Sequence, residues 1–370
     1  MFFLISLVLS LSSLFLNNDT AEIVFAGDAM QHKAQIDAAK KSDDIYTYDE
    51  CFEAIAQYVQ NADYAVVNLE TPLGGTPYSG YPMFCSPDSY SLALKNAGFD
   101  LLLTANNHSL DKRDKGAKRT LDILDKQDID HIGTYRNEVE RNNVLPFIKN
   151  INGYKIAFLN YTYGTNGIAI QKDIIVDYID KLKIKKDVEN ARNSGAEIIA
   201  VAIHWGTEYI LLPNATQKAL ADYLTNLGVD LIIGGHPHVI QPMEIRWSKI
   251  HNKKVFLVYS LGNFISNMKT NDTRGGAMAK VKITRNEYGK PIIASASYRL
   301  IFTLKPSQKN YNFKIIPVED YTSGVQKTQC DIFVKNAENI FNKHNINVPR
   351  DKTPIRKKID LRNKDNNINK

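Results

Sequence analysis

Five short apolar runs in this 370-residue chain each end in a side chain that can bind a metal ion. The runs are typical of buried strands, and the side chains at their ends are Asp28, Glu70, Asn107, His204 and His236. In open α/β sheets the carboxyl ends of the strands meet at one edge, and ligands bind there. Helical periodicity between the runs predicts mainly parallel sheets covered by helices. We therefore expect an α/β protein with a ligand site at the strand ends.

A sixth candidate, His238, follows His236 after a single proline. The preceding apolar run, residues 231–233, stops at two glycines, which predicts a turn at the carboxyl end of a strand. Proline fixes φ in this turn, so both imidazoles can face neighbouring positions, where neutral imidazoles suit one or two metal ions. Taken alone, the motif could also be a pair of structural or surface histidines.

The other candidates have ordinary structural explanations as well. Asp28 could cap a following helix, Asn107 and His108 could form a polar capping turn, and His32 could be either an added ligand or an exposed histidine. Five separate strand ends with such side chains favour a shared site. The oxygen and nitrogen donor set suits Mn, Fe, Zn or Mg. Two such ions, about 3.5–4 Å apart, can activate a hydroxide and stabilise charge on a phosphoryl or carbonyl oxygen.

Cysteine usage and charge exclude other classes of protein. Cys51, Cys85 and Cys330 are too widely spaced for a cysteine-based zinc module; one disulfide with a spare thiol, or three free thiols, remain open. The formal charge is +6, but residues 351–370 hold seven Lys/Arg and three Asp, a net +4. The nearly neutral body argues against nucleic-acid binding. The tail itself is expected to be basic and disordered.

Residues 1–20 are predicted to be a signal peptide or an N-terminal anchor. Met1 to Leu16 are almost wholly apolar, which is short for a membrane span but suits the apolar region of a signal peptide. A basic start is missing, and no cysteine follows that would support a lipoprotein anchor. We expect export to the periplasm or to the membrane surface of the cell envelope, with membrane contact only through an uncleaved N-terminal segment.

The rest of the chain is predicted to form one main domain, residues 21–303, followed by an extension, residues 304–350, that packs on it. The further expected elements are helices over 46–60 and 174–194 and antiparallel strands over 277–283 and 292–302 that close the sheet.

Six segments of the chain resemble the CapA family, the bacterial capsule and poly-γ-glutamate synthesis proteins related to calcineurin-like metallophosphoesterases. The segments are Gly27–Met30, Asn68–Pro72, Ala105–Asp111, His204–Tyr209, Gly235–His238 and Tyr259–Phe264. Their order and spacing agree with the family as well as their residue types. The resemblance implies a four-layer α-β-β-α sandwich of the metallo-dependent phosphoesterase type, with two divalent metal ions held between strand ends.

The resemblance also implies roles for individual residues. Asp28 and His238 are similar to ligands of a first metal ion, and Glu70 to the carboxylate that bridges two ions. The residues that resemble ligands of a second ion are Asn107, His204 and His236.

Two further residues resemble catalytic groups of the family. His108 is similar to a general acid or charge stabiliser, and Glu208, with Tyr209, to a group that orients the site or the substrate. Two residues depart from the wider phosphoesterase pattern: Met30 stands where that pattern has a histidine, and Glu70 where it has an aspartate.

These roles imply a metal-dependent hydrolase of the cell envelope in capsule or poly-γ-glutamate biosynthesis or processing. Its substrate would be an anionic polymer or a phosphoester, and whether other capsule synthesis proteins are partners is left open. The alternatives are a general phosphoesterase acting on nucleotides or phosphodiesters, an amide hydrolase acting on γ-glutamyl bonds, and a non-catalytic component that binds the polymer for synthesis or export.

Overall fold

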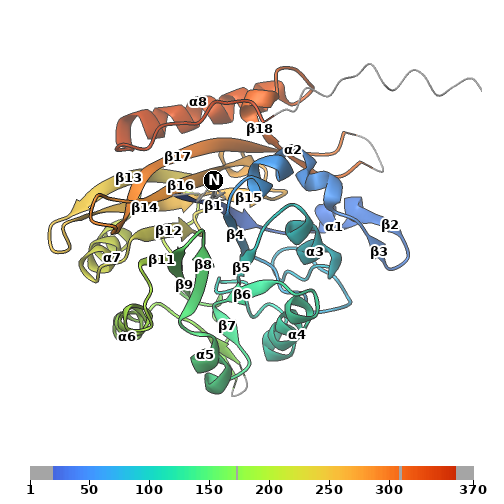
Figure 1. Cartoon of the computed structure of the whole chain (residues 1–370). Coiled ribbons are helices and arrows are strands. Elements are labelled where there is room, and N and C mark those ends of the chain that lie inside the picture. The colour runs from blue at the N-terminus through green and yellow to red at the C-terminus, as the bar shows by residue number, and fades with distance from the viewer. Residues whose placement is uncertain (1–19, 172–173, 308–310, 356–370) are drawn as a thin grey trace, which may run out of the picture.

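Two β-sheets stacked face to face form the centre of the protein, and helices cover their outer faces (Figure 1). The computed structural model describes residues 20–171, 174–307 and 311–355, so the expected signal peptide up to residue 19 and the tail from residue 356 lie outside it. The layer order confirms the predicted α-β-β-α sandwich. Within the described ranges, no helix is both long and apolar enough to cross a lipid bilayer.

The first sheet is mixed, with strand order β18-β17-β16-β1-β4-β5-β6, and β15 pairs with β1. β1, β4, β5 and β6 are parallel neighbours, whereas β16, β17 and β18 run antiparallel, which confirms the predicted antiparallel strands. The bounds are β1 (Thr20–Ala29), β4 (Tyr64–Leu69), β5 (Leu101–Leu103), β6 (Asp130–Ile132), β15 (Asn263–Ile265), β16 (Gly275–Arg285), β17 (Pro291–Leu304) and β18 (Lys314–Pro317).

The second sheet has strand order β13-β14-β12-β11-β9-β8, with four parallel strands between two antiparallel edge strands. The bounds are β8 (Phe147–Ile151), β9 (Tyr154–Thr162), β11 (Ile198–His204), β12 (Leu231–Gly235), β13 (Ile240–Ser248) and β14 (Lys253–Leu261). Two further strand pairs are small: β2 (Lys40–Ser42) with β3 (Ile45–Tyr46), and β7 (Thr134–Tyr135) with β10 (Ile175–Val176).

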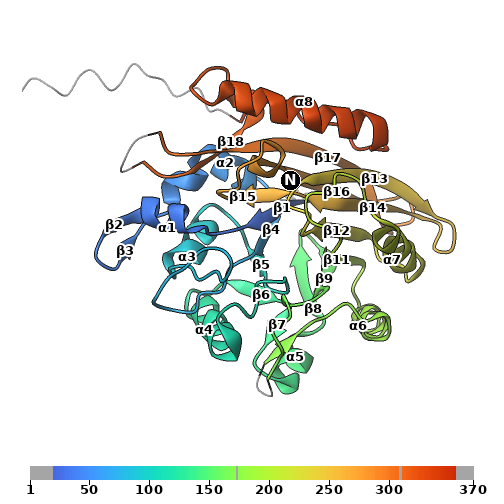
Figure 2. The same ribbon diagram turned by 180° about the vertical axis from the view of Figure 1, so that it is seen from behind.

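Helices cover both sheets. α2 and α3 pack on the outer face of the first sheet and α6 and α7 on that of the second, while α8 lies over β13 and β17 in both views (Figures 1 and 2). The helix bounds are α1 (Lys33–Ala39), α2 (Asp49–Gln60), α3 (Ser89–Asn96), α4 (Arg113–Lys126), α5 (Glu138–Val144), α6 (Lys181–Asn193), α7 (Ala215–Asn226) and α8 (Lys327–His344), with 3-10 turns η1 (Asp272–Arg274) and η2 (Val318–Asp320).

Two predicted helices begin later than expected: the helix predicted over 46–60 begins at Asp49, and the one predicted over 174–194 is shortened more. The periodicity suggested a helix over 174–194, but Ile175 and Val176 instead form β10 against β7, and the helix begins only at Lys181. The Asp180 carboxylate accepts a hydrogen bond from the backbone N–H of Lys183 at 2.8 Å. This cap fixes the helix start, because it satisfies an N–H that has no partner within the helix.

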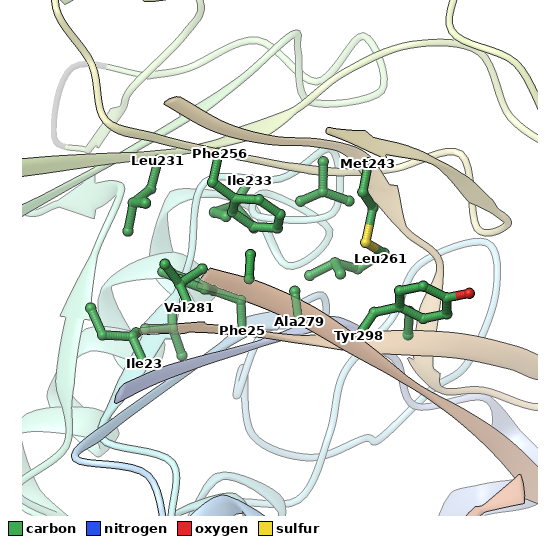
Figure 3. Close-up of a cluster of buried hydrophobic side chains, with 14 of the residues drawn as sticks. Ile23, Phe25, Leu231, Ile233, Met243, Phe256, Leu261, Ala279, Val281 and Tyr298 are labelled. Atoms are coloured by element: carbon green, nitrogen blue, oxygen red, sulfur yellow. The ribbon is translucent and has the colours of Figure 1, made fainter. Parts of the chain in front are cut away.

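The two sheets are held together by apolar side chains from their inner faces (Figure 3). Ile23 and Phe25 of β1 face Leu231 and Ile233 of β12, and all four are buried. The alternate residues of β1 point to the other face and pack against the helix layer. Because both faces of β1 are buried, its sequence is almost continuously apolar, as expected for a central strand.

The alternation of β1 is interrupted once, by a bulge at Gly27. Ala26 pairs with Val67 and Asp28 with Asn68, so Gly27 is an extra residue in the ladder. If Gly27 instead took a regular place in the ladder, Asp28 would face the helix layer as Ala26 does, because successive side chains alternate between faces. The bulge turns Asp28 to the inner face, beside Asn68. The bulged conformation at Gly27 therefore decides where this carboxylate points.

The three cysteines are buried and unpaired, so the alternative with one disulfide is wrong and the alternative with three free thiols holds. Burial raises the pKa of the Cys330 thiol to about 11. At the C-terminal end of the described chain, the Asp351 carboxylate accepts a hydrogen bond from the Arg299 guanidinium at 2.7 Å. This pair holds the chain after α8 against β17.

Replacing Gly27 with alanine should destabilise the protein, because the added Cβ would lie 1.9 Å from the carbonyl oxygen of Gly262. Overpacking of this kind typically costs about 1–3 kcal/mol. Urea unfolding of Gly27→Ala and of Gly164→Ala measures the effect, since a Cβ at Gly164 meets nothing within 4 Å. Equal stability of the two variants would contradict the close approach at the bulge.

Candidate metal centre

The six candidate ligands converge where the carboxyl ends of strands from both sheets meet. The first sheet contributes three of them through β1 and the segments after β4 and β5, and the second contributes three through β11 and the turn after β12. All six are buried: Asp28, Glu70, Asn107, His204, His236 and His238. The expected shared site is therefore a property of the fold, while the role of each residue in it stays a prediction.

Asp28, Glu70 and His238 form one candidate ion-binding group. His238 Nδ1 lies 3.4 Å from Asp28 Oδ2, and His238 Nε2 lies 3.8 Å from Glu70 Oε1. One potential ligand atom from each residue lies within 4.8 Å of the others, so one ion could contact all three. Asp28 is not a helix cap, because it lies within β1 and α1 begins at Lys33.

His204 connects this group to the remaining candidates. Its Nε2 lies 2.9 Å from Asn107 Oδ1 and 3.5 Å from Glu70 Oε1, and its ring centroid lies 4.8 Å from that of His236. Glu70 Oε1 therefore stands within 4 Å of imidazole nitrogens of both His204 and His238. A carboxylate in this position is suited to bridge two ions.

A second candidate ion-binding group consists of Glu208, His236 and His238, again with ligand atoms within 4.8 Å of one another. Glu208 belongs to the loop after β11, and the structure brings it to the imidazoles as the sequence suggested. His32 lies outside both groups. Its Nδ1 accepts a hydrogen bond from the backbone N–H of Asn267 at 3.3 Å, and it stands at the start of α1.

Burial sets the charge state of the centre. Burial, with repulsion from Asp28, raises the pKa of Glu70 well above its usual value. Burial alone would also raise the pKa of Asp28, but the hydrogen bond with His238 and the charges of the nearby histidines hold it well below its usual range. Burial lowers the pKa of His204 to about 3 and that of His236 to about 2. Neutral imidazole is the form that binds metal ions.

His238 differs from the other two histidines. Burial would lower its pKa, but the carboxylates of Glu70 and Asp28 outweigh this and raise it to about 9. The charge of an imidazolium or of a bound cation can therefore balance the two carboxylates at this position. Among the six candidate ligands, two buried atoms lack a hydrogen-bond partner within the described residues, Glu70 Oε1 and His236 Nδ1. A buried polar atom without a partner costs free energy, because it has lost its hydrogen bonds to water. Binding a metal ion would give these two atoms a partner.

The turn after β12 is strained around the two histidines. His236 has φ 98° and His238 φ 57°, the left-handed region that favours glycine. A Cβ at Gly235 would lie 2.9 Å from Asp28 Oδ1, so glycine permits the close approach of the turn to β1. Strained backbone of this kind persists where the surroundings enforce it, often at functional sites.

Two asparagines orient the ligand side chains, and the sequence did not indicate these roles. Asn68 Nδ2 donates a hydrogen bond to Asp28 Oδ1 at 2.8 Å, and Asn263 Oδ1 lies 3.0 Å from His238 Nδ1. Asn68 precedes Glu70 by two residues, so the period of a strand could have suggested a shared face. Asn263 comes from β15, and its place beside His238 depends on pairing that no local pattern reveals.

His108 lies next to this cluster with its own partner. Its Nδ1 is 2.7 Å from Asp111 Oδ2, and its ring packs edge-on against Phe84 with centroids 4.6 Å apart. Asp111 Oδ2 also accepts a hydrogen bond from the backbone N–H of Phe84 at 2.6 Å. The imidazole is therefore fixed in orientation, which a proton donor requires. The sequence indicated His108 but not its carboxylate partner.

Comparison with known proteins identifies the family. The chain matches the family described as "Bacterial capsule synthesis protein PGA_cap" over residues 22–268, which include all six candidate ligands. The chain belongs to this family. It is 27% identical over 286 residues to the Capsule biosynthesis protein CapA of Bacillus anthracis, covering 73% of this chain and 65% of that protein. It is 30% identical over 284 residues to the PGA biosynthesis protein CapA of Bacillus subtilis (strain 168), covering 74% of this chain and 70% of that protein.

These PGA_cap relatives confirm the resemblance to the CapA family drawn from the six segments. The chain spans about two thirds of the length of the curated relatives that it matches. Two solved structures are also similar. The NAD nucleotidase (NadN) of Haemophilus influenzae has a TM-score of 0.49 and 12% identity, covering 90% of this chain and 64% of that one. A putative 5'-nucleotidase from Staphylococcus aureus has a TM-score of 0.46 and 14% identity, covering 85% of this chain and 58% of that one.

Removing the partner of His238 should weaken metal binding. Outer partners of metal-binding histidines typically contribute about 10–100-fold to metal affinity, so we expect Asn263→Ala to lose affinity for Mn²⁺ and Zn²⁺ by about that factor. Isothermal titration of the purified variants measures the change. The matched control is Asn150→Ala, an exposed residue of β8 whose side chain accepts a hydrogen bond from the backbone N–H of Gly153. An affinity of Asn263→Ala equal to that of the control would show that Asn263 does not orient His238.

Proposed function

We propose that this protein is a metal-dependent hydrolase of the cell envelope that acts in the biosynthesis or processing of a bacterial capsule polymer. The proposal depends on one observation, the buried cluster in which two carboxylates and three imidazoles converge. Within it, Glu70 Oε1 and His236 Nδ1 lack hydrogen-bond partners among the described residues. The names of the relatives support a capsule setting, because one is a capsule and the other a PGA biosynthesis protein. For this chain, export, poly-γ-glutamate as the polymer and an anionic polymer or phosphoester as the substrate belong to the proposal.

The cluster has enough ligands for two divalent ions, which we expect to be Mn, Fe, Zn or Mg. Asp28 and His238 would hold one ion, and Glu70 would bridge to the other. The ligands of the second ion would be Asn107, His204 and His236. When bound, such a pair supplies an activated water molecule and positive charge at the oxygen on which negative charge develops.

The remaining residues of the site would act on protons and on solvent. His108, whose ring is held by Asp111, would protonate a leaving oxygen or nitrogen. Phe84 is fully buried against the His108 ring, so it keeps water from that side of the imidazole. Glu208, close to His236 and His238, would hold the nucleophilic water or the substrate in position.

A non-catalytic protein that binds the polymer is the second candidate, and Met30 favours it. Met30 occupies the position of a ligand histidine in the wider phosphoesterase pattern, and its side chain is buried. A thioether is a poor ligand for hard divalent ions. With one ligand fewer, a single ion could be held for binding alone, and measured metal content separates the two candidates.

Metal content should depend on the cluster histidines. We expect about two divalent ions per wild-type chain by elemental mass spectrometry, and a loss of at least one in His204→Ala and in His236→Ala. The control is His251→Ala, an exposed histidine whose ring contacts the backbone carbonyl of Asn226. Hydrolysis of a phosphomonoester, a phosphodiester and poly-γ-glutamate is measured on the same samples. If wild-type protein contains no metal and hydrolyses none of these substrates, the hydrolase proposal is wrong. Binding of the polymer in that case would support the second candidate.

His108 should affect chemistry and not metal binding. General acid catalysis contributes about 10²–10⁴-fold, so we expect kcat of His108→Ala to fall by about that factor on the substrate that wild type hydrolyses best. Its metal content should equal that of wild type. A substrate with a better leaving group should recover much of the loss, since it needs no proton. An unchanged kcat would remove His108 from the mechanism.

A further inference from the structure

Three exposed tyrosines surround the metal cluster, each from a different loop. Tyr81 belongs to the loop after β4, Tyr163 follows β9, and Tyr209 follows β11; we call them the tyrosine rim. Their exposed fractions are 76%, 47% and 53%. Large aromatic side chains are usually buried more fully, so three exposed ones around one cluster call for an explanation.

Each rim tyrosine is connected to a histidine of the site. The Tyr163 ring centroid lies 4.5 Å from that of His236, and the Tyr209 centroid 6.2 Å from that of His238. Tyr81 lies 6.3 Å from Phe84, which packs on the His108 ring. Each ring therefore lies against a site histidine, or against Phe84 beside one, and is also open to solvent.

The backbone of Tyr209 is fixed in a conformation that a tyrosine rarely adopts. Its φ is 65°, in the left-handed region, and its backbone N–H donates to the carbonyl of Pro237 at 2.8 Å. The fully buried Gln241 donates from Nε2 to the carbonyl of the next residue, Ile210, at 2.7 Å. Gln241 is itself held by a hydrogen bond from Gln217 at 2.8 Å. Strained backbone that is held by hydrogen bonds is common at functional sites. The position of the exposed Tyr209 side chain therefore points to a function.

The contacts of the cluster and of the rim favour a particular kind of ligand. Within the described chain, no hydrogen bond or ring contact of the cluster residues or of the rim involves a lysine or arginine. The acidic Glu208 stands beside Tyr209. A polyanion with one carboxylate per unit would need cations along its path. Tyrosine faces instead suit a ring with an apolar face, and their hydroxyls suit its polar edge.

We propose that the tyrosine rim binds the sugar ring of a sugar-phosphate unit whose phosphate lies at the metal cluster. This inference rests on the proposed metal-dependent hydrolase. The metal cluster would bind the phosphate, and the tyrosine rim would select which group is attached to it. Rigid tyrosines lose little conformational freedom on binding, so they can contribute affinity at small entropic cost.

The test uses the metal-loaded full chain labelled with 3-fluorotyrosine and observed by fluorine NMR. The probes are glucose 1-phosphate, galactose 1-phosphate, N-acetylglucosamine 1-phosphate, inorganic phosphate and oligo-γ-glutamate. Variants Tyr81→Phe, Tyr163→Phe and Tyr209→Phe assign the rim signals. The control signal is that of Tyr288, which is 77% exposed in the turn between β16 and β17.

We expect at least one sugar phosphate to shift the rim signals and not that of Tyr288, with a Kd at least tenfold below that of inorganic phosphate. The double variant Tyr163→Leu with Tyr209→Leu should lose about tenfold in affinity for that sugar phosphate, whereas the phenylalanine variants keep the ring and most of the affinity. Thermal unfolding checks that the leucine variant is folded.

Other results overturn the inference in distinguishable ways. If oligo-γ-glutamate and no sugar phosphate moves the rim signals, the rim serves a polyanion and the inference is wrong. If phosphate binds but no probe moves the rim, the inference fails while the metal-dependent hydrolase stands. If the chain binds neither metal nor phosphate, both proposals fail.

Discussion

Two carboxylates, those of Asp28 and Glu70, are buried side by side where the two sheets meet, and the site depends on how their charge is balanced. Burying an unpaired charge is costly, and two like charges add repulsion. The amide of Asn68 donates to both carboxylates, at 2.8 and 3.4 Å, and His238 adds one imidazole. Among the described residues, no lysine or arginine forms an ion pair with either carboxylate. A divalent cation is the partner that such an arrangement fits best.

Neither sheet can build this site alone. The first sheet supplies the carboxylates and Asn107, and the second supplies the three imidazoles. Their relative position is set by the apolar layer between the sheets and by two close approaches that only glycine allows, at Gly27 and at Gly235. A change in packing between the sheets would therefore displace carboxylates relative to imidazoles. Stability of the core and geometry of the site are coupled for this reason.

The sequence predicted the six candidate ligands because parallel strands bring their carboxyl ends to one edge, which is a local signal repeated five times. It could not predict the side to which Asp28 points, because the bulge at Gly27 depends on pairing with β4. Asn263 was missed as a partner of His238 for a similar reason, since β15 is a three-residue strand added to β1. The helix expected over 174–194 was too long because Ile175 and Val176 continue its apolar periodicity, while pairing with β7 outweighs that preference. Long-range pairing accounts for each of these differences.

The direction of β1 separates the start of the described chain from the metal cluster. Thr20 and Asp28 stand at opposite ends of this strand, which at about 3.3 Å per residue places them roughly 26 Å apart. Thr20 lies beside the turn between β8 and β9, where its carbonyl accepts a hydrogen bond from Asn152 at 3.1 Å. A surface or bead coupled just before Thr20 would thus hold the domain by the edge remote from the cluster. Protein immobilised in this way would present its cluster to the solution.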